Sequence, residues 1–291
     1  MKVLAEVTPM SEAEVERWQS FGMQVGAAVL VPRVVQGRLD PNGGSGVLVR
    51  ICRRDFVLTA GHVVCDEATR KPVPKTEIAV QFPRDDGLFL GIKPGEMIAE
   101  FCATYEPDVA VIELDAKHAV YWRNHAPITL ERIASAATLA RKERFLVFGV
   151  PGETTTEGPS GIEPVREGNV VTMRREVTTA AVPVVTFAYR NVVNEHAPAD
   201  GRCFHVGWDH FGRHGEAEPQ RIKPHGVSGG AVLAVDREPI QLVGLVRSTF
   251  RDKYLLCEPI LPALRLLMAH PDAGVRDEVL AAVVRLEAST P

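Results

Sequence analysis

Three residue types that can together activate a hydroxyl group occur at separate points of the chain, each beside small or apolar residues. His62 ends the segment Thr-Ala-Gly-His, Asp108 comes directly before the apolar residues 109–112, and Ser228 is enclosed by glycines. A serine hydroxyl is a weak nucleophile until a neighbouring base takes its proton, and the imidazolium formed then needs a carboxylate to orient and stabilise it. We therefore interpret His62, Asp108 and Ser228 as a candidate catalytic triad.

The residues around Ser228 suit a tight turn. Residues 226–230 read Gly-Val-Ser-Gly-Gly. Because glycine accepts a positive φ that a Cβ opposes, backbone N–H groups in such a turn can converge on a developing oxyanion. The turn therefore provides both a nucleophile and a place to stabilise negative charge.

The elements that must position these residues are mainly short strands. Val-rich runs separated by Gly, Pro, Asn or Asp predict strands over residues 24–31, 46–50, 56–59, 78–82, 109–114, 145–150, 168–173, 182–189, 230–235 and 241–246. Two comparable β-rich halves that join near residues 129–144 predict two packed barrels. Helices are expected after Ser11 and over residues 262–268 and 275–286. The polar segment 191–223 is interpreted as a loop insertion.

Composition indicates an ordinary globular chain. It has 291 residues, 45% hydrophobic and 24% charged, with a formal net charge of -4. That charge gives no general surplus of Lys and Arg for binding phosphates, so no nucleic-acid partner is expected.

The chain contains no long apolar segment. Charged residues interrupt every apolar run, beginning with Glu6, so we expect neither a signal peptide nor contact with a membrane. Five cysteines at irregular spacing favour reduced thiols and a cytoplasmic location.

The three chemically suggestive segments resemble those of the trypsin and chymotrypsin clan of serine peptidases. Residues 59–62 match the family's Thr-Ala-Ala-His except at one small residue, and residues 108–114 are similar to its Asp-Ile-Ala-Leu-Leu-x-Leu. Residues 226–230 resemble its Gly-Asp-Ser-Gly-Gly. The similarity extends over roughly residues 24–260 and keeps the family's order of His, Asp and Ser.

This resemblance implies an all-β fold of two six-stranded antiparallel β-barrels, with a short N-terminal helix and a C-terminal helical tail. The implied segments are 1–22 for the N-terminal helix, 23–128 for the barrel with His62 and Asp108, 129–260 for the barrel with Ser228, and 261–291 for the tail. It also implies a serine endopeptidase that cleaves a protein or peptide through an acyl-enzyme, with the N–H groups of Gly226 and Ser228 as oxyanion hole. No cofactor and no metal ion are expected.

Three positions depart from the secreted members of the family. Val227 stands where those members have an aspartate that pairs with a newly cut N-terminus, and residues 25–26 only faintly resemble their Ile-Val-Gly-Gly start. Val63 replaces the half-cystine that follows the histidine. We therefore expect an intracellular, bacterial-type peptidase that needs no N-terminal cut. Any control is expected from the segment 191–223 or from an activating partner protein.

The family's primary specificity pocket suggests which residue precedes the cleaved bond. Its floor lies six residues before the nucleophile, at Ile222 here, and its wall corresponds to residues 246–249, including Val246 and Thr249. An apolar floor leaves a Lys or Arg side chain desolvated and unpaired, so basic residues rank last. Small apolar residues rank first, and acidic residues rank second because the ammonium of Lys223 could reach the pocket.

Other interpretations of these residues stay open. His62 and Ser228 can each be ordinary turn residues, and Asp115 is a rival to Asp108, although it follows the strand instead of preceding it. The serine turn also satisfies the G-x-S-x-G pattern of α/β-hydrolases, which need a histidine after the serine, and only His270 lies there. A binding or scaffold protein that keeps the fold without turnover is the other alternative.

A second group of residues has side chains that commonly bind metals. It consists of Cys203, His205, His210 and His214. Because its spacing matches no zinc pattern, we interpret the group as part of a solvated loop.

Overall fold

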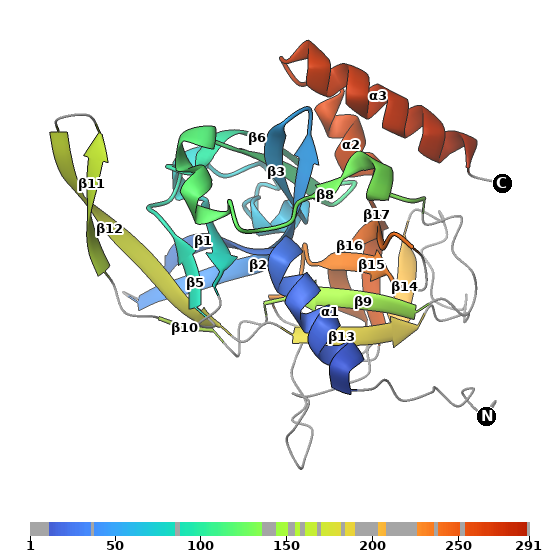
Figure 1. The fold of residues 1–291 in the computed structure, drawn as a ribbon, viewed down its shortest axis with the longest axis horizontal. Coiled ribbons are helices and arrows are strands. Elements are labelled where there is room, and N and C mark those ends of the chain that lie inside the picture. Colours follow the sequence, from blue (N-terminus) through green and yellow to red (C-terminus); the bar gives the residue numbers. More distant parts are fainter. Residues whose placement is uncertain are drawn as a thin grey trace.

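Most of the described residues lie in β-strands, which form two sheets, and the chain ends in two helices (Figure 1). The computed structural model describes residues 12–35, 38–84, 88–135, 144–150, 155–157, 161–167, 170–181, 184–189, 203–207, 226–235, 238–250 and 254–289. The mainly β content, the antiparallel pairing and the helical C-terminal part agree with the expectation from sequence.

The first sheet has 11 strands and is formed largely by the first half of the chain. In order across the sheet they are β10 (Thr155–Glu157), β12 (Val170–Ala181), β5 (Leu88–Gly91), β4 (Ala79–Pro83), β1 (Gly26–Val35), β2 (Arg38–Ile51), β3 (Arg54–Thr59), β7 (Val109–Leu114) and β6 (Ile98–Thr104). Two strands lie off this path: β11 (Gly161–Glu167) pairs with β12, and β8 (Ile128–Thr129) pairs with β2 in parallel. All other pairs in this sheet that the structure describes are antiparallel.

The second sheet has six strands, all in antiparallel pairs. Their order is β13 (Val184–Tyr189), β9 (Arg144–Gly149), β15 (Ala231–Ala234), β16 (Gln241–Phe250), β17 (Tyr254–Pro259) and β14 (Phe204–Gly207). Among the described residues, the pairings leave both sheets open, so closed barrels stay a prediction.

Three α-helices and four short 3₁₀ turns complete the described part of the fold. The helices are α1 (Glu12–Val25), α2 (Leu261–Leu267) and α3 (Ala273–Ala288). The turns are η1 (Gly61–Val63), η2 (Lys75–Glu77), η3 (Ala116–Tyr121) and η4 (Leu130–Arg132). In Figure 1, α2 and α3 lie together at one end of the molecule, beside β3 and the tip of β17. No helix within the described residues has the length and apolar composition needed to cross a bilayer.

Strand β7, which directly follows Asp108, is buried on both faces. Successive side chains of a strand point to opposite faces. Val109 and Val111 accordingly belong to the core cluster shared with α2, α3 and the second sheet, whereas Ala110 and Ile112 belong to a separate cluster inside the first sheet. All six residues of β7 are buried. This central position gives the candidate aspartate a rigid support.

The structure contains strands that were not predicted, namely β5, β6, β8, β10, β11, β14 and β17, and it changes two further expectations. The first strand begins at Gly26 because α1 continues through Val25. The segment 191–223, interpreted as a loop, contains strand β14, which pairs with β17 along its whole length. The remainder of that segment lies outside the described residues, except for Cys203.

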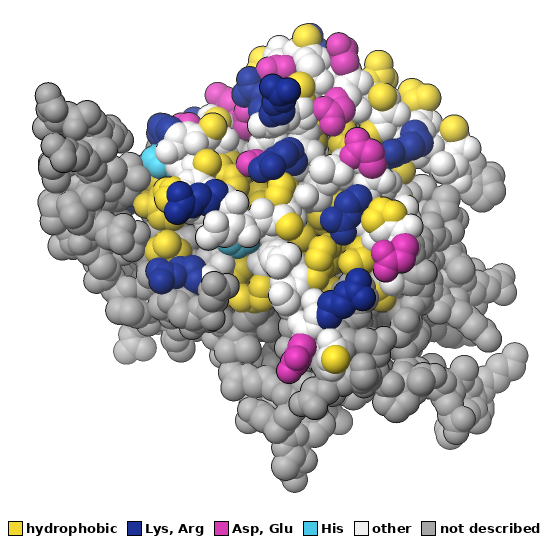
Figure 2. All heavy atoms as spheres, viewed as in Figure 1, with side chains coloured by type: hydrophobic (Ala, Val, Ile, Leu, Met, Phe, Trp, Pro, Cys, Tyr) yellow, Lys and Arg dark blue, Asp and Glu magenta, His cyan; other side chains and the backbone are white. Residues whose placement is uncertain are grey.

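The described surface mixes both signs of charge. On the face shown in Figure 2, Lys and Arg side chains are interspersed with Asp and Glu side chains and with apolar atoms. Exposed large apolar side chains include Leu280 and Val284, one turn apart on α3, and Val120 on η3. On this face, the described residues therefore present no broad patch of a single charge sign.

Candidate active site

Asp108 holds His62 at two points. One carboxylate oxygen of Asp108 accepts a hydrogen bond from the backbone N–H of His62 at 2.7 Å, and the other lies 2.7 Å from the ring Nδ1. The Asp108 side chain is only 3% exposed, whereas that of His62 is 35% exposed. Because a carboxylate only accepts hydrogen bonds, Nδ1 carries the proton of the neutral ring, and Nε2 is left as the basic nitrogen.

The local backbone explains how these two residues meet. His62 lies in turn η1 immediately after β3, and Asp108 lies just before β7, which pairs with β3. A Cβ at Gly61 would overlap the carbonyl oxygen of Thr104, so only glycine lets this turn approach the end of β6. The Thr104 hydroxyl donates to the carbonyl of Pro107 at 2.6 Å and ties the connection that leads to Asp108.

Ser228 lies in the predicted glycine-rich turn. Gly226 and Gly229 have φ angles of 91° and 84°, in the left-handed region that favours glycine. A Cβ at Gly229 would also overlap Ser45 and Thr59 of the first sheet. The turn therefore packs directly against the strand that leads to His62.

Ser45 on β2 connects the serine turn to the first sheet. Its backbone N–H donates to the carbonyl of Ser228 at 2.6 Å, and its hydroxyl donates to the carbonyl of Gly226 at 2.8 Å. The same hydroxyl accepts from the backbone N–H of Val150 at 2.7 Å, and the Ser45 carbonyl accepts from the Thr59 hydroxyl at 2.7 Å. Ser45 is fully buried. This residue therefore joins both halves of the candidate site.

Arg247 on β16 links Ser228 to Asp108. The Ser228 hydroxyl donates to the backbone carbonyl of Arg247 at 3.1 Å. The Arg247 guanidinium Nε lies 3.8 Å from a carboxylate oxygen of Asp108, and its Nη1 lies 2.9 Å from Glu258. Among the described residues, no hydrogen bond joins Ser228 directly to His62. The three candidate residues thus lie at one site, with Ser228 turned toward Arg247.

The N–H groups of the serine turn differ in their hydrogen bonding. Within the described part of the chain, the N–H groups of Gly226 and Ser228 have no hydrogen-bond acceptor. The next two N–H groups are occupied, since Gly229 donates to Val246 at 2.6 Å and Gly230 donates to Val227 at 2.8 Å. Gly226 and Ser228 are half-buried, so their N–H groups can pair with a ligand or with water.

Val227 is buried in the apolar interior of the second sheet. Its side chain is 1% exposed and packs with Val147 and Val232. A Cβ at Gly149 would overlap it. The position that carries an acidic side chain in secreted members of the resembling family is therefore part of a hydrophobic cluster here.

The predicted specificity residues are only partly described. Ile222 and Lys223 lie outside the described residues. Val246 is 1% exposed and belongs to the same apolar cluster as Val227. The backbone of Thr249 pairs with Leu255 in the β16–β17 hairpin. Which residues line the specificity pocket therefore stays a prediction.

The rival aspartate has a different environment. Asp115 caps turn η3 by accepting from the backbone N–H of Lys117 at 3.1 Å, and it pairs with the Lys117 ammonium at 2.7 Å. The hydrogen bond from Lys117, followed by its charge, lowers the pKa of Asp115. Asp108, and not Asp115, is the aspartate that contacts His62.

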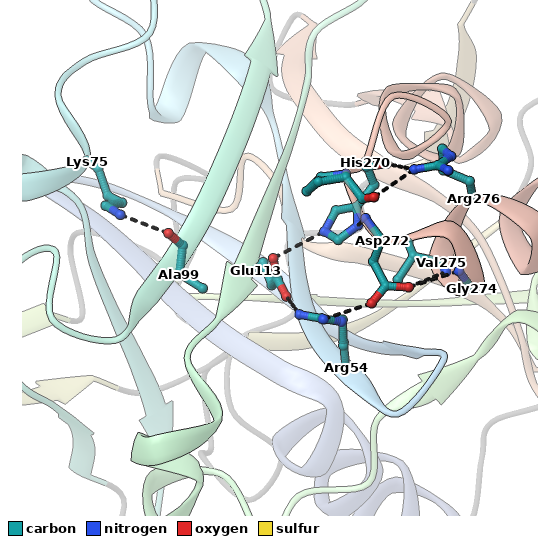
Figure 3. Close-up of polar contacts among 10 residues, drawn as sticks. Arg54, Lys75, Ala99, Glu113, His270, Asp272, Gly274, Val275 and Arg276 are labelled. Carbon is teal, nitrogen blue, oxygen red and sulfur yellow. Dashed lines mark hydrogen bonds and ion pairs between the residues drawn. The ribbon is translucent and has the colours of Figure 1, made fainter.

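His270 belongs to a charge network at the other end of β7, in which the side chains of Glu113 and His270 are buried and that of Arg54 is partly exposed (Figure 3). Arg54 lies between Glu113 and Asp272, with ion-pair distances of 2.6 and 2.8 Å. His270 Nε2 lies 3.2 Å from the second carboxylate oxygen of Glu113, and Nδ1 accepts from the backbone N–H of Asp272 at 3.1 Å. Both ring nitrogens of His270 are therefore occupied, which leaves neither of them as a free base.

The five cysteines all lie in the described part of the chain and are free thiols. Cys257 is buried in β17, Cys203 is buried just before β14, both near Glu258, and Cys65 is buried three residues after His62. Of the group with metal-binding residue types, His210 and His214 lie outside the described residues. The Sγ atom of Cys203 lies 3.6 Å from the Arg247 guanidinium.

Sequence reasoning missed three residues of this site. Ser45, Arg247 and Glu258 act through partners that are distant in sequence. Arg247 was considered only as part of the pocket wall at residues 246–249, and Ser45 and Glu258 belong to no interpreted motif. The available signals are a serine between glycines at residues 44–46, and charged residues within otherwise apolar strands at 247 and 258. A charge in a buried strand needs a partner, which is a reason to search for one.

Comparison with known proteins gives no further identification. No protein-family model matches the chain, and a search of the curated proteins found no match. The site geometry and the residues themselves therefore carry the functional argument.

Proposed function

We propose that this chain is a serine endopeptidase that hydrolyses peptide bonds with Ser228 as nucleophile. The observation that carries the proposal is the double contact of Asp108 with the backbone and the ring of His62. An ordinary turn histidine does not require a buried carboxylate that fixes both its position and its tautomer. Such an arrangement is what a general base needs beside a hydroxyl nucleophile.

In the proposed reaction, Ser228 attacks the carbonyl carbon of the scissile peptide bond while His62 Nε2 takes its proton. The imidazolium then gives that proton to the leaving amine, and an acyl-enzyme remains on Ser228. Water repeats the sequence to release the acid product. Asp108 keeps the ring in place and stabilises its positive charge at each stage.

Two features prepare the attack. The Ser228 hydroxyl must turn from the Arg247 carbonyl to His62, which exchanges one hydrogen bond for another between staggered rotamers. Hydrogen bonds of this kind are often long or misaligned before substrate binds. The unpaired N–H groups of Gly226 and Ser228 would bind the oxyanion, each contributing on the order of 3 kcal/mol by analogy with measured oxyanion holes.

We further propose membership of the trypsin and chymotrypsin clan, with two six-stranded barrels. Support comes from the three motifs in the family's order, from a His–Asp pair in the first sheet and from a serine turn in the second. Five free thiols support a reducing, cytoplasmic setting.

Activity is proposed to need no N-terminal cleavage. Val227 is packed in an apolar cluster, so a charged N-terminus inserted there would be desolvated without a partner. The chain with its N-terminus intact should therefore cleave substrate as purified. Activity restricted to chains trimmed before Val25 would refute this.

The substrate is proposed to be a protein or peptide cut after small apolar residues. Acidic residues rank second and basic residues last, because Ile222 offers a cation no charge partner. Profiling with a peptide library tests the order. Dominant cleavage after Lys or Arg would exclude Ile222 as the pocket floor, and an acidic preference lost in Lys223→Ala would promote the second option.

The two alternatives make different predictions. An α/β-hydrolase-type esterase would need His270 as its base, but both ring nitrogens of His270 are occupied beside Glu113. A silent binding protein would keep the geometry without turnover. Cleavage of an unfolded protein substrate by the wild-type chain, lost in Ser228→Ala with the fold retained, supports the peptidase. Equal rates for the two chains at equal purity would reject it.

A further inference from the structure

The Arg247 guanidinium lies between two buried carboxylates at the candidate site. Its Nη1 is 2.9 Å from Glu258, and its Nε is 3.8 Å from Asp108. Both carboxylate side chains are 3% exposed, and that of Arg247 is 31% exposed. Glu258 also accepts from the backbone N–H of Asp108 at 3.4 Å. Glu258 therefore contacts both the aspartate and the arginine that faces it.

A β-bulge places Arg247 in this position. Across the β16–β17 pair, Val246 faces Cys257 and Ser248 faces Leu256, so Arg247 is the extra residue with no partner of its own. Bulges redirect side chains next to functional sites. Here the bulge lets the backbone carbonyl of Arg247 accept from Ser228 while its side chain reaches Asp108.

Three thiols of the described residues interact electrostatically with this cluster, and they are neutral when an imidazole titrates. Burial, followed by the charge of Glu258, raises the pKa of Cys203 to about 11. Burial raises the pKa of Cys257 well above its usual value, and burial followed by the charge of Asp108 raises that of Cys65. Among the described residues, the charged side chains of this cluster beside the His62–Asp108 pair are therefore those of Asp108, Glu258 and Arg247.

We propose that the Arg247–Glu258 ion pair is a positioning device that holds Asp108 and sets the charge felt by the His62 ring. Two carboxylates and one guanidinium leave a net charge of about -1 beside His62 at neutral pH. A net negative charge on these three side chains stabilises the positively charged imidazolium of His62. If the charges of the three side chains summed to zero, the imidazolium would be stabilised less. The pair thereby determines the pH range in which His62 is a neutral base. This role rests on the proposed peptidase function of the same site.

The sign of each change follows from the charge balance. Glu258→Gln leaves the charges of Asp108 and Arg247 to cancel, so the titration midpoint of His62 should fall by about one pH unit. Adding Arg247→Met to Glu258→Gln leaves Asp108 alone and restores the net charge. The midpoint of the double variant should therefore return to within a few tenths of a pH unit of the wild-type value.

The test is an NMR titration of the His62 ring in the wild-type chain, in E258Q and in E258Q/R247M. Glu113→Gln is the matched control, because Glu113 is also a buried carboxylate paired with an arginine but does not contact Asp108. The midpoint of His62 in E113Q should not move. If E258Q does not fold, E258M removes the same charge with similar volume and carries the same prediction.

Two results would overturn the proposal. One is an unchanged midpoint in the folded Glu258 variant, and the other is an equal fall in E113Q. The acid limb of the pH–rate profile for kcat/KM should move in the same direction as the NMR midpoint. Because the NMR titration needs no turnover, a wild-type chain that cleaves nothing would reject the peptidase function alone. Normal turnover with unmoved midpoints would reject the charge device alone.

Discussion

The carboxylate of Asp108 does two separate tasks for one residue. One oxygen fixes the backbone of His62, and the other fixes its ring. A side chain held in this way loses little additional freedom when a ligand binds, so His62 is already oriented for its proposed role as base. The contact with Arg247 limits the carboxylate to this orientation, since rotation would separate it from the guanidinium.

Asp108→Asn should remove catalysis while leaving the fold in place. The amide oxygen can still accept from the backbone of His62, but the amide NH₂ would then face ring Nδ1 and force the proton onto Nε2. A ring in that tautomer cannot take the proton of Ser228, so kcat should fall by about 10⁴-fold by analogy with the known triad. Asp115→Asn is the control and should keep wild-type kcat. Similar losses in both variants would contradict the assignment of Asp108.

Ser45→Ala should destabilise the chain and disturb the serine turn. The substitution leaves the buried N–H of Val150 and the carbonyl of Gly226 without their partner. An unsatisfied buried group costs about 1–3 kcal/mol, so the urea midpoint and kcat should both decrease. Ser289→Ala removes an exposed hydroxyl that bonds only to its own helix and should change neither value. An unaltered urea midpoint in Ser45→Ala would refute the role of Ser45.

Among the single residues of the site, the sequence identified those that lie in a short segment with a recognisable pattern. His62, Asp108 and Ser228 each lie in a short recognisable segment next to a predicted strand. The role of Arg247 and Glu258 is different, because their contact with Asp108 exists only where a β-bulge places Arg247 beside it. That contact depends on pairing between strands distant from Asp108 in sequence, which a local pattern does not encode.

Among the elements, β7 is supported at both ends by charged contacts. Asp108 precedes it, and Glu113 near its end pairs with Arg54 of β3 and with His270 (Figure 3). Asp272 then extends the network to α3, where its side chain accepts from the first N–H groups of the helix. These contacts attach α3 to strand β7, which directly follows the candidate aspartate.

The contribution of Asp272 should depend on pH. The hydrogen bond from Arg54, followed by that from the backbone of Val275, lowers the pKa of Asp272. A lowered pKa in the folded state stabilises the fold above the unfolded value, about 4, and this contribution is lost as the pH falls through the folded value. Asp272→Asn keeps a residue that can cap the helix, so it isolates the charge. Its Tm should lie below the wild-type Tm at pH 7, and the difference should shrink below about pH 4.

Asp277→Asn provides the matched control for this titration. Asp277 is exposed on the same helix and has no hydrogen bond to another described residue. Its Tm should follow the wild-type curve at every pH. A Tm difference for Asp272→Asn that is equally large at pH 3 and pH 7 would show that the charge of Asp272 does not stabilise the helix.

Helices and strands were predicted correctly where the residues follow a single hydrophobic pattern. The continuous apolar run of β7 and the helical spacing of α2 and α3 identified these elements within a few residues. Strand β14 was missed because it lies in a polar segment, and only its pairing with β17 makes it a strand. Strand β12 was predicted in part, but its pairing with β5 of the first sheet is a long-range contact that no local pattern contains.

In the whole molecule, the candidate site forms where the serine turn meets the first sheet. Gly44 and Gly229 have no side chains, and a Cβ at either would press on the opposing segment. Ser45 bonds across this contact, and Arg247 reaches from the second sheet to Asp108. The candidate site therefore depends on the contact between the two halves and not on either half alone.

The most direct test of this account is labelling with a fluorophosphonate probe, which reacts with activated serine hydroxyls, followed by mass spectrometry of the labelled peptide. The wild-type chain should be labelled at Ser228. Labelling should be absent in Ser228→Ala and strongly reduced in His62→Ala, while Asp115→Asn should be labelled like the wild type. A folded wild-type chain that remains unlabelled, or a label on any residue other than Ser228, would contradict the assignment of the nucleophile.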